Sequence, residues 1–199
     1  MGINLQKGQR ISLKKQAPKL KKLMCGLGWD VAKKKGGFLG GLFTSDFDLD
    51  ASVICLGRSG RMASMDDLVY FGNLKHASSA IMHLGDNLTG KGDGDDEQIM
   101  VNLDGIPDRI HSLVFAVNIY NCIERKQDFS QVSNAFVRLV NCENNKEIAR
   151  YSLSGDDYGS KTGMVMAQIN RGEDGDWEVC AEGEGIKISN LGEIAQLYS

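Results

Sequence analysis

The sequence predicts an all-β fold, a two-sheet β-sandwich with about ten strands and one or two short helices. Apolar residues recur at a period of two far more often than at the helical period of about 3.6 residues. Short clusters of Gly, Asn and Asp separate the apolar runs, as expected of tight turns. The long amphipathic helices that connect the strands of a parallel sheet are missing from the pattern, which disfavours an α/β fold.

Ten runs of residues are expected as strands. In chain order they are Lys22–Gly28, Asp50–Leu56, Leu68–Phe71, Ala80–Leu84, Gln98–Leu103, Ile110–Tyr120, Ala135–Asn141, Glu147–Leu153, Met164–Asn170 and Trp177–Ala181. Gln98–Leu103 alternates most clearly, and Ile110–Tyr120 is apolar enough to be a central strand. A helix is expected at Leu191–Leu197 with Asn190 as its N-cap, and a second short one at the Asp128–Ser133 turn.

Length and composition describe an ordinary globular protein. The chain has 199 residues, 42% hydrophobic and 25% charged, so residues 1–199 are expected to form a single domain. No run of about 18 apolar residues would span a membrane, and the start of the chain has no apolar signal segment. The five cysteines are widely spaced and form no C-x-x-C pair, which is typical of reduced thiols. We therefore expect a cytoplasmic location.

The net charge of −3 combines a basic N-terminal part with an acidic remainder. No aromatic residues are interleaved with the basic ones, so nucleic acid is not an expected partner. Residues 33–44 are expected to form a flexible Gly-rich insertion, in which Lys33–Lys35 precede Gly pairs around Phe38 and Phe43. A loop is the simpler interpretation of this stretch. The alternative is peripheral contact of residues 33–43 with a membrane surface, because exposed Phe beside Lys is the interfacial pattern.

Two segments, Asp46–Asp50 and Gly85–Glu97, concentrate carboxylates. The candidate metal ligands are the carboxylates of Asp46, Asp48, Asp50, Asp86, Asp93, Asp95, Asp96 and Glu97, together with the neutral oxygens of Asn87 and Thr89. Like charges this close repel unless they are solvated or neutralised by a cation, and Ca²⁺ takes about six to eight oxygen ligands. Eight carboxylates are too many for one divalent ion, so we expect about two Ca²⁺ per chain.

Three known motifs resemble the second acidic segment, and each fails. An EF-hand loop that begins at Asp86 would have Leu88 at its third position and Lys91 where Gly is required. A phosphate-binding loop would have Gly92 where Ser or Thr must hold Mg²⁺. A calcium-binding nonapeptide solenoid needs several copies of its repeat, and the pattern occurs once. No Cys or His stands among the candidate ligands, which disfavours transition metals. A solvated acidic loop without a metal remains the alternative.

Several motifs follow one another along the chain in a recognisable order. They are Gly26-Leu-Gly-Trp-Asp30, Asp46-Phe-Asp-Leu-Asp-Ala-Ser52, the string from Gly85 to Glu97, Val101-Asn-Leu-Asp-Gly-Ile-Pro107, Phe129-Ser-Gln-Val-Ser133, Phe136-Val-Arg-Leu-Val140 and Ala149-Arg-Tyr151. Together they resemble the TerD family of tellurite-resistance and general stress proteins, from about Leu5 to Tyr198. The resemblance implies a cytoplasmic β-sandwich that binds Ca²⁺ and has no established catalytic activity. Relatives tend to carry two Asn after a strand aromatic, where this chain has Phe71-Gly72-Asn73, so the resemblance adds Asn73 to the candidate metal ligands.

The leading interpretation is a non-enzymatic, calcium-binding stress-response protein that acts through protein partners. The alternatives are a metal-dependent hydrolase and a Ca²⁺-dependent membrane-docking module. A hydrolase needs a general base near the ion, and His83 lies two residues before the Gly85–Glu97 segment. Its alternation with Met82 and Leu84 predicts that His83 faces outward. His76 has no acidic neighbour in sequence, so no catalytic residue is expected.

Overall fold

The computed structural model describes residues 2–31, 48–85, 94–153 and 158–199. Its strands are β1 (Ile3–Asn4), β2 (Arg10–Ser12), β3 (Lys22–Val31), β4 (Leu49–Leu56), β5 (Leu68–Val69), β6 (Ile81–His83), β7 (Glu97–Asn102), β8 (Ser112–Ile119), β9 (Val132–Asn141), β10 (Lys146–Ser152), β11 (Gly163–Arg171) and β12 (Trp177–Ile186). Its helices are α1 (Leu13–Gln16), α2 (Cys122–Arg125) and α3 (Leu191–Leu197), with the short 3₁₀ turns η2 (Met65–Asp67), η3 (Leu103–Gly105) and η4 (Phe129–Gln131).

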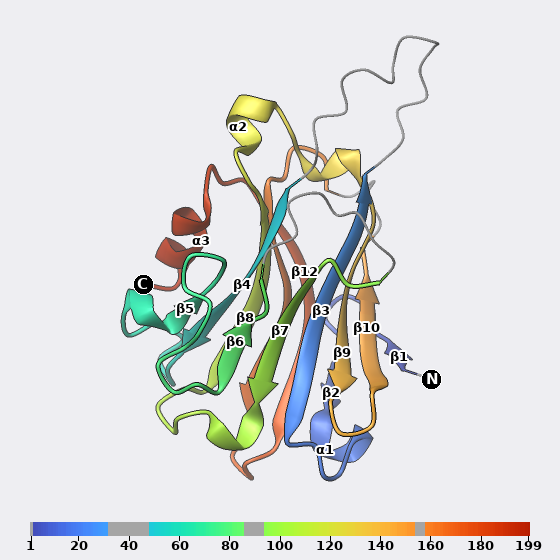
Figure 1. Ribbon diagram of the computed structural model, residues 1–199, viewed down its shortest axis with the longest axis vertical. Helices are drawn as coiled ribbons and strands as arrows, with labels where there is room; N and C mark the ends of the chain where they lie inside the picture. Colours follow the sequence, from blue (N-terminus) through green and yellow to red (C-terminus); the bar gives the residue numbers. More distant parts are fainter. Residues whose placement is uncertain (1, 32–47, 86–93, 154–157) are drawn as a thin grey trace.

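The described strands form two six-stranded sheets that pack face to face (Figure 1). The first sheet has the order β1-β10-β9-β3-β7-β6, and the second has the order β2-β12-β11-β8-β4-β5. Neighbouring strands pair antiparallel, except for β1, which pairs parallel with β10. The predicted fold class, a two-sheet β-sandwich, is confirmed.

Each of the ten predicted strands is present in the structure, with ends that shift by a few residues. The helix Leu191–Leu197 is confirmed as α3, and the Asn190 side chain accepts a hydrogen bond from the Glu193 amide as its cap. The expected turn at Asp128–Ser133 forms η4. The prediction missed the two N-terminal strands, β1 and β2, and the single-turn helices α1 and α2.

The main hydrophobic core lies between the sheets. Every second residue of the strands points into this core. Phe115 of β8 and Ile99 of β7, for example, are fully buried there. A second, smaller cluster covers the outer face of the second sheet, where Ile54 and Val114 pack with Ile194 of α3. Strands β4 and β8 are therefore apolar on both faces. None of the helices in the described residues is long and apolar enough to cross a membrane.

The described parts of both predicted acidic segments, 48–50 and 94–97, lie at the same end of the sandwich, toward the top of Figure 1. Strands β3 and β6 end there, and β4 and β7 begin there. The antiparallel pairing of β3 with β7 sets Leu27 opposite Glu97, so the segment before β7 lies against the last residues of β3. This topology brings together acidic residues that are far apart in sequence.

Candidate metal centre

Asp50 lies in the second sheet and pairs with Asn118 of β8. The register sets the two residues opposite each other, and the Asn118 amide nitrogen donates a hydrogen bond of 3.2 Å to Asp50 Oδ2. Both side chains are almost completely buried, with 3% of each residue exposed. Neighbouring Leu49 and Ala51 point into the core between the sheets, so Asp50 points to the opposite face of β4.

Asn118 is a candidate ligand that the sequence analysis missed. Its buried Oδ1 has no hydrogen-bond partner within the described residues, while its Nδ2 is used by Asp50. Buried amide oxygens are almost always satisfied, and amide oxygens are among the ligands that Ca²⁺ takes. The signal was available in the sequence, because Asn118 is a lone polar residue inside the apolar run Leu113–Ile119.

Asp48 immediately precedes β4 and lies on the side of helix α2. Its carbonyl oxygen accepts a hydrogen bond of 2.8 Å from the Tyr120 amide, which fixes the start of the strand. Its carboxylate Oδ2 lies 3.7 Å from a guanidinium nitrogen of Arg125, and the residue is 5% exposed. Asp48 and Asp50, both predicted as metal ligands, are thus both buried.

Glu97 comes from the first sheet and connects it to the second. Its Oε2 accepts a hydrogen bond of 2.6 Å from the backbone amide of Ala51, one residue beyond Asp50. The same oxygen lies 3.3 Å from Nε2 of His83, and Glu97 is 2% exposed. A carboxylate held this way brings the first residues of β7 next to the edge of β4.

The predicted outward orientation of His83 is wrong. His83 is 2% exposed, whereas Met82 and Leu84 beside it are 38% and 53% exposed. Strand β6 is the edge of the first sheet, where apolar side chains reach solvent, and Glu97 offers the inward imidazole a charged partner. The prediction from side-chain polarity alone therefore placed His83 on the wrong face of β6.

Asp95 is bound by an arginine. Arg138 of β9 donates two hydrogen bonds to its carboxylate, from Nε at 2.7 Å and from Nη2 at 3.0 Å. The Asp95 side chain is fully buried and packs directly against Gly26 of β3, where any Cβ would overlap the carboxylate. The hydrogen bond from Arg138 to Asp95 is also the main reason why the pKa of this guanidinium is raised. This pair anchors the beginning of β7 to the outer face of the first sheet.

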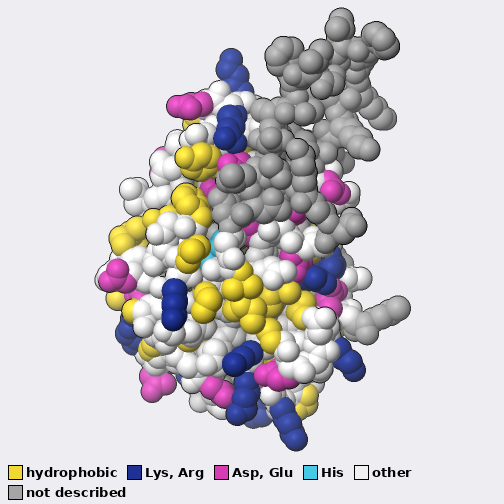
Figure 2. Space-filling model, in the orientation of Figure 1, with side chains coloured by type: hydrophobic (Ala, Val, Ile, Leu, Met, Phe, Trp, Pro, Cys, Tyr) yellow, Lys and Arg dark blue, Asp and Glu magenta, His cyan; other side chains and the backbone are white. Residues whose placement is uncertain are grey.

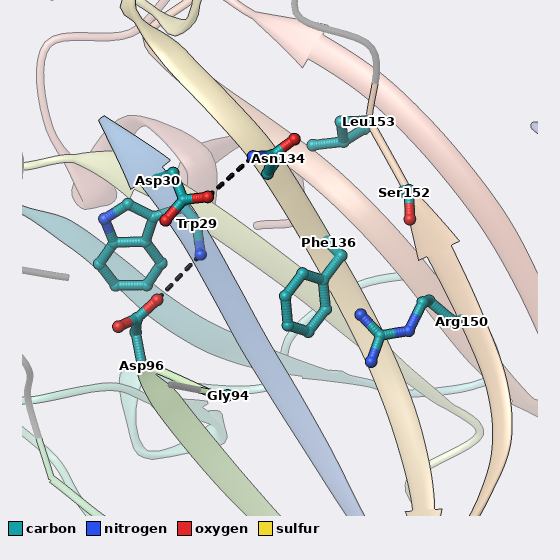
Figure 3. Close-up of a pocket in the computed structure, with 9 residues that line it drawn as sticks. All are labelled: Trp29, Asp30, Gly94, Asp96, Asn134, Phe136, Arg150, Ser152 and Leu153. Carbon is teal, nitrogen blue, oxygen red and sulfur yellow. Dashed lines mark hydrogen bonds between the residues drawn. The ribbon is translucent and has the colours of Figure 1, made fainter. Parts of the chain in front are cut away.

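Asp96 lies beside Trp29 near the end of β3 and lines an open pocket of about 440 Å³ (Figure 3). Its Oδ2 accepts a hydrogen bond of 2.9 Å from the Trp29 amide. Asp30 lies beside it and accepts a hydrogen bond of 2.8 Å from Asn134 Nδ2. Burial raises the pKa of the Asp96 carboxyl, and the charge of Asp30 raises it further. The remaining residues that line the pocket are Gly94, Phe136, Arg150, Ser152 and Leu153.

Asn73 closes a tight turn next to β6. Its backbone exchanges hydrogen bonds with Tyr70, at 2.9 and 3.1 Å, and its Nδ2 donates to the Leu68 carbonyl at 2.7 Å. The next residue, Leu74, accepts a hydrogen bond from the His83 amide, so the turn lies beside the strand that carries His83. The amide nitrogen of Asn73 thus has a structural role in this turn.

The remaining predicted ligands, Asp46, Asp86, Asn87, Thr89 and Asp93, lie outside the described residues, as does the insertion 33–44. In the ranges that the structure does describe, no three His, Cys, Asp or Glu side chains are grouped so that they could hold a metal by themselves. The described candidates form two groups at the same end of the sandwich. Asp48, Asp50 and Glu97 lie around β4, and Asp95 and Asp96 lie along β3.

His76 lies in a second polar cluster, outside the acidic end, which the sequence analysis did not anticipate. Its Nε2 lies 3.1 Å from Asp67 Oδ1, and its Nδ1 lies 2.7 Å from Ser78 Oγ. The Ser78 amide donates to Nδ1, so the ring proton is on Nε2 and points to Asp67. Arg109 binds both oxygens of Asp67, at 2.7 and 2.9 Å. The arrangement stabilises the connection between β5 and β6.

The fold and the acidic end define a β-sandwich domain with carboxylates at one end of its sheets, and the family model for the TerD domain matches residues 1–198. The chain belongs to the TerD family.

Its relatives carry names from stress and metalloid resistance. "Stress response protein SCP2" of Bacillus subtilis is 46% identical to the chain, and the alignment covers all of both proteins. "Tellurium resistance protein TerD" of Serratia marcescens is 40% identical, over 93% of this chain and 91% of the relative. The crystal structure of a homologue of telluride resistance protein TerD from Streptomyces coelicolor superposes with a TM-score of 0.68 at 20% identity, over 90% of this chain and 98% of that one.

Proposed function

We propose that this protein is a calcium-binding stress-response protein of the TerD type, which binds about two Ca²⁺ at the acidic end of the sandwich and acts through protein partners in the cytoplasm. The observation that carries the proposal is the pair Asp50 and Asn118. The buried carboxylate of Asp50 lies beside Asn118, whose buried Oδ1 has no hydrogen-bond partner in the described structure. Carboxylate and amide oxygens are both ligands of the kind that a hard cation takes.

The chemistry of the other donors fits the same kind of ion. Asp48 and Glu97 are buried carboxylates at the same end of the sandwich, at 5% and 2% exposure. Burying several carboxylates together is costly unless positive charge compensates them. A divalent cation supplies that compensation. The donors are all oxygens, which favours Ca²⁺ over transition metals.

Two ions rather than one are supported by the separation of the donors into two groups. Asp50 belongs to β4 and Glu97 binds the backbone of that strand, whereas Asp96 binds the backbone of Trp29 in β3. Asp95 is better explained as a structural residue, because Arg138 uses both of its oxygens. We therefore propose one site around Asp50 and Asn118 and a second beside Asp96.

A role through partners is supported by exposed aromatic side chains beside the acidic end. Phe71 and Tyr120 are 40% and 41% exposed, and their rings meet edge to face at 6.2 Å. Ile123 of α2 is 60% exposed, and Tyr120 is bonded through its backbone to Asp48. Aromatic and apolar side chains of this kind are enriched at the centre of protein interfaces.

The hydrolase alternative is less well supported. His83, the histidine nearest to the acidic residues, is buried against Glu97 and is not placed to act as a general base on a bound substrate. His76 and Asp67 are also buried, at 1% and 0% exposure, and Arg109 already neutralises the carboxylate. The geometry fits a binding protein better.

Calorimetric titration of chelator-stripped protein with Ca²⁺, and then with Mg²⁺, tests the proposal. We expect two Ca²⁺ per chain and weak competition by Mg²⁺, which prefers few protein ligands. Asp50→Asn should remove one of the two binding events. The matched control Asp66→Asn changes an exposed carboxylate on η2 and should bind as the wild type does. No heat on Ca²⁺ addition would refute the proposal, and an unchanged titration of Asp50→Asn would refute the assigned site.

A further inference from the structure

Three methionines lie in one row across the outer face of the first sheet. Met82 of β6 is opposite Met100 of β7, and Met100 is opposite Met24 of β3. Residues directly opposite on neighbouring strands point to the same face, so the three thioethers share one side of the sheet. Val140 of β9 continues the row beyond Met24.

This face of the sheet is open. Met82 is 38% exposed, and Met24 and Met100 are partly exposed. Figure 2 shows hydrophobic side chains gathered over the middle of this face, in front of β6, β7 and β3. By contrast, the outer face of the second sheet is covered by α3 and its own hydrophobic cluster.

We propose that Met24, Met82 and Met100 form a binding site for a soft monovalent cation, Cu⁺ or the closely related Ag⁺. Thioether sulfur is a soft ligand that selects Cu⁺ over hard cations. Lys22 precedes Met24 by two residues, and Lys75 pairs with Met82, so positive charge flanks the row. That positive charge does not attract cations, so binding here rests on coordination by sulfur, whereas the acidic end attracts cations by its charge.

The spacing of the strands allows the three sulfurs to reach one ion. Opposite Cβ atoms on neighbouring strands are on the order of 5 Å apart, so Met100 lies within reach of both of its neighbours. Each methionine side chain has three rotatable bonds and adapts its sulfur position at little cost. An ion above Met100 can therefore take Met82 and Met24 as ligands from either side.

A thiol near the row has to be separated from the methionines in any test. Cys142 directly follows β9, is exposed, and its amide donates a hydrogen bond of 3.1 Å to the carbonyl of Lys22, two residues before Met24. The other four cysteines of the chain are buried. Because thiolates bind soft metals strongly, the experiment is made in a Cys142→Ser background.

The test is a titration with Ag⁺, which binds like Cu⁺ but is not redox-active in air, followed by NMR of methionine methyl groups. We expect one equivalent of Ag⁺ to shift the methyl signals of Met24, Met82 and Met100 and to leave Met65, Met164 and Met166 unchanged. Loss of a residue that only supports a metal ligand lowers metal affinity about 10–100-fold. Met100→Leu removes a ligand itself and should therefore weaken Ag⁺ binding by at least as much. Met65→Leu, at a methionine with 58% exposure on η2, is the matched control and should bind like the background protein.

Three results would overturn the assignment: no shift in the row, equal shifts at Met65 and in the row, or an unchanged affinity of Met100→Leu. Circular dichroism and the melting temperature of Met100→Leu show whether the variant is folded, and replacing Met by Leu conserves volume. Met82→Leu is the second variant, and because Met82 is on an exposed edge strand its effect on folding is small. Addition of Ca²⁺ should leave the Ag⁺ titration unchanged, which separates this site from the acidic end.

Discussion

Replacing Asp67 by asparagine removes the centre of the buried polar cluster that joins η2 to the β5–β6 connection. The carboxylate accepts two hydrogen bonds from Arg109 and lies 3.1 Å from His76 Nε2. Burial alone would raise the pKa of the Asp67 carboxyl. The hydrogen bonds from Arg109 and His76 outweigh burial, and the pKa falls from 3.8 to about 2. An asparagine in the same place carries no charge and offers one oxygen where two are used.

The lowered pKa of Asp67 limits how much stability Asp67→Asn can remove. A shift of one unit corresponds to about 1.4 kcal/mol, so the lowered pKa is worth at most about 2.5 kcal/mol of folding free energy. The Arg109 side chain is 52% exposed, and solvent screening reduces its share. We expect Asp67→Asn to lower the free energy of unfolding by about 1–2 kcal/mol at pH 6. Because the folded pKa lies below the unfolded one, this stabilisation is complete above about pH 4 and is lost as the pH falls through about 2.

Urea unfolding at pH 6 and at pH 3, followed by circular dichroism, measures this difference. The difference in the free energy of unfolding between wild type and Asp67→Asn should fall at pH 3 to about half of its value at pH 6. Asp66→Asn is the control, because Asp66 is adjacent and exposed. The free energy of unfolding of this variant should stay close to that of the wild type at both pH values. A difference of the same size at pH 6 and pH 3 for Asp67→Asn would show that the charge of Asp67 is not what stabilises the cluster.

Three further predictions concern the acidic end and the thiols. Gly26→Ala should destabilise the fold by about 1–3 kcal/mol in urea unfolding, because its Cβ overlaps Asp95, whereas Gly57→Ala has ordinary contacts and should cost much less. Saturating Ca²⁺, at about one hundred times its dissociation constant, should add about 2.7 kcal/mol of stability, and equal melting temperatures in Ca²⁺ and in chelator would contradict this. In a thiol assay Cys142 should react quickly in the native protein, while Cys55, whose pKa burial raises to about 12, should react only after denaturation.

The sequence predicted those parts of the fold that depend on local pattern. Ten strands were found because alternation and turn residues are properties of neighbouring positions. Strands β1 and β2 were missed because they are defined by their pairing with β10 and β12, far along the chain. Helices α1 and α2 are single turns, too short to show a helical period.

The candidate site shows the same division between features set by local sequence and features set by distant partners. Clustered carboxylates were visible in the sequence, but their separate roles depend on residues brought from other strands. The structural role of Asp95 depends on Arg138, which no spacing rule connects to it. The inward face of His83 depends on Glu97 in the neighbouring strand. Asn118 was passed over because an apolar central strand was interpreted as core, although one polar residue in such a run requires a partner.

The positions of β1 and β2 have a consequence for the order in which the protein folds during synthesis. These strands are made first, yet β1 completes the first sheet by pairing with β10, and β2 completes the second by pairing with β12. Neither outer edge can be closed until residues 146–186 have left the ribosome, so the nascent chain carries two unsatisfied strands for almost the whole of translation. Long-range pairings of this kind slow folding and leave exposed edges open to other chains. Slower elongation or an N-terminal fusion should therefore lower the yield of this protein more than its final stability.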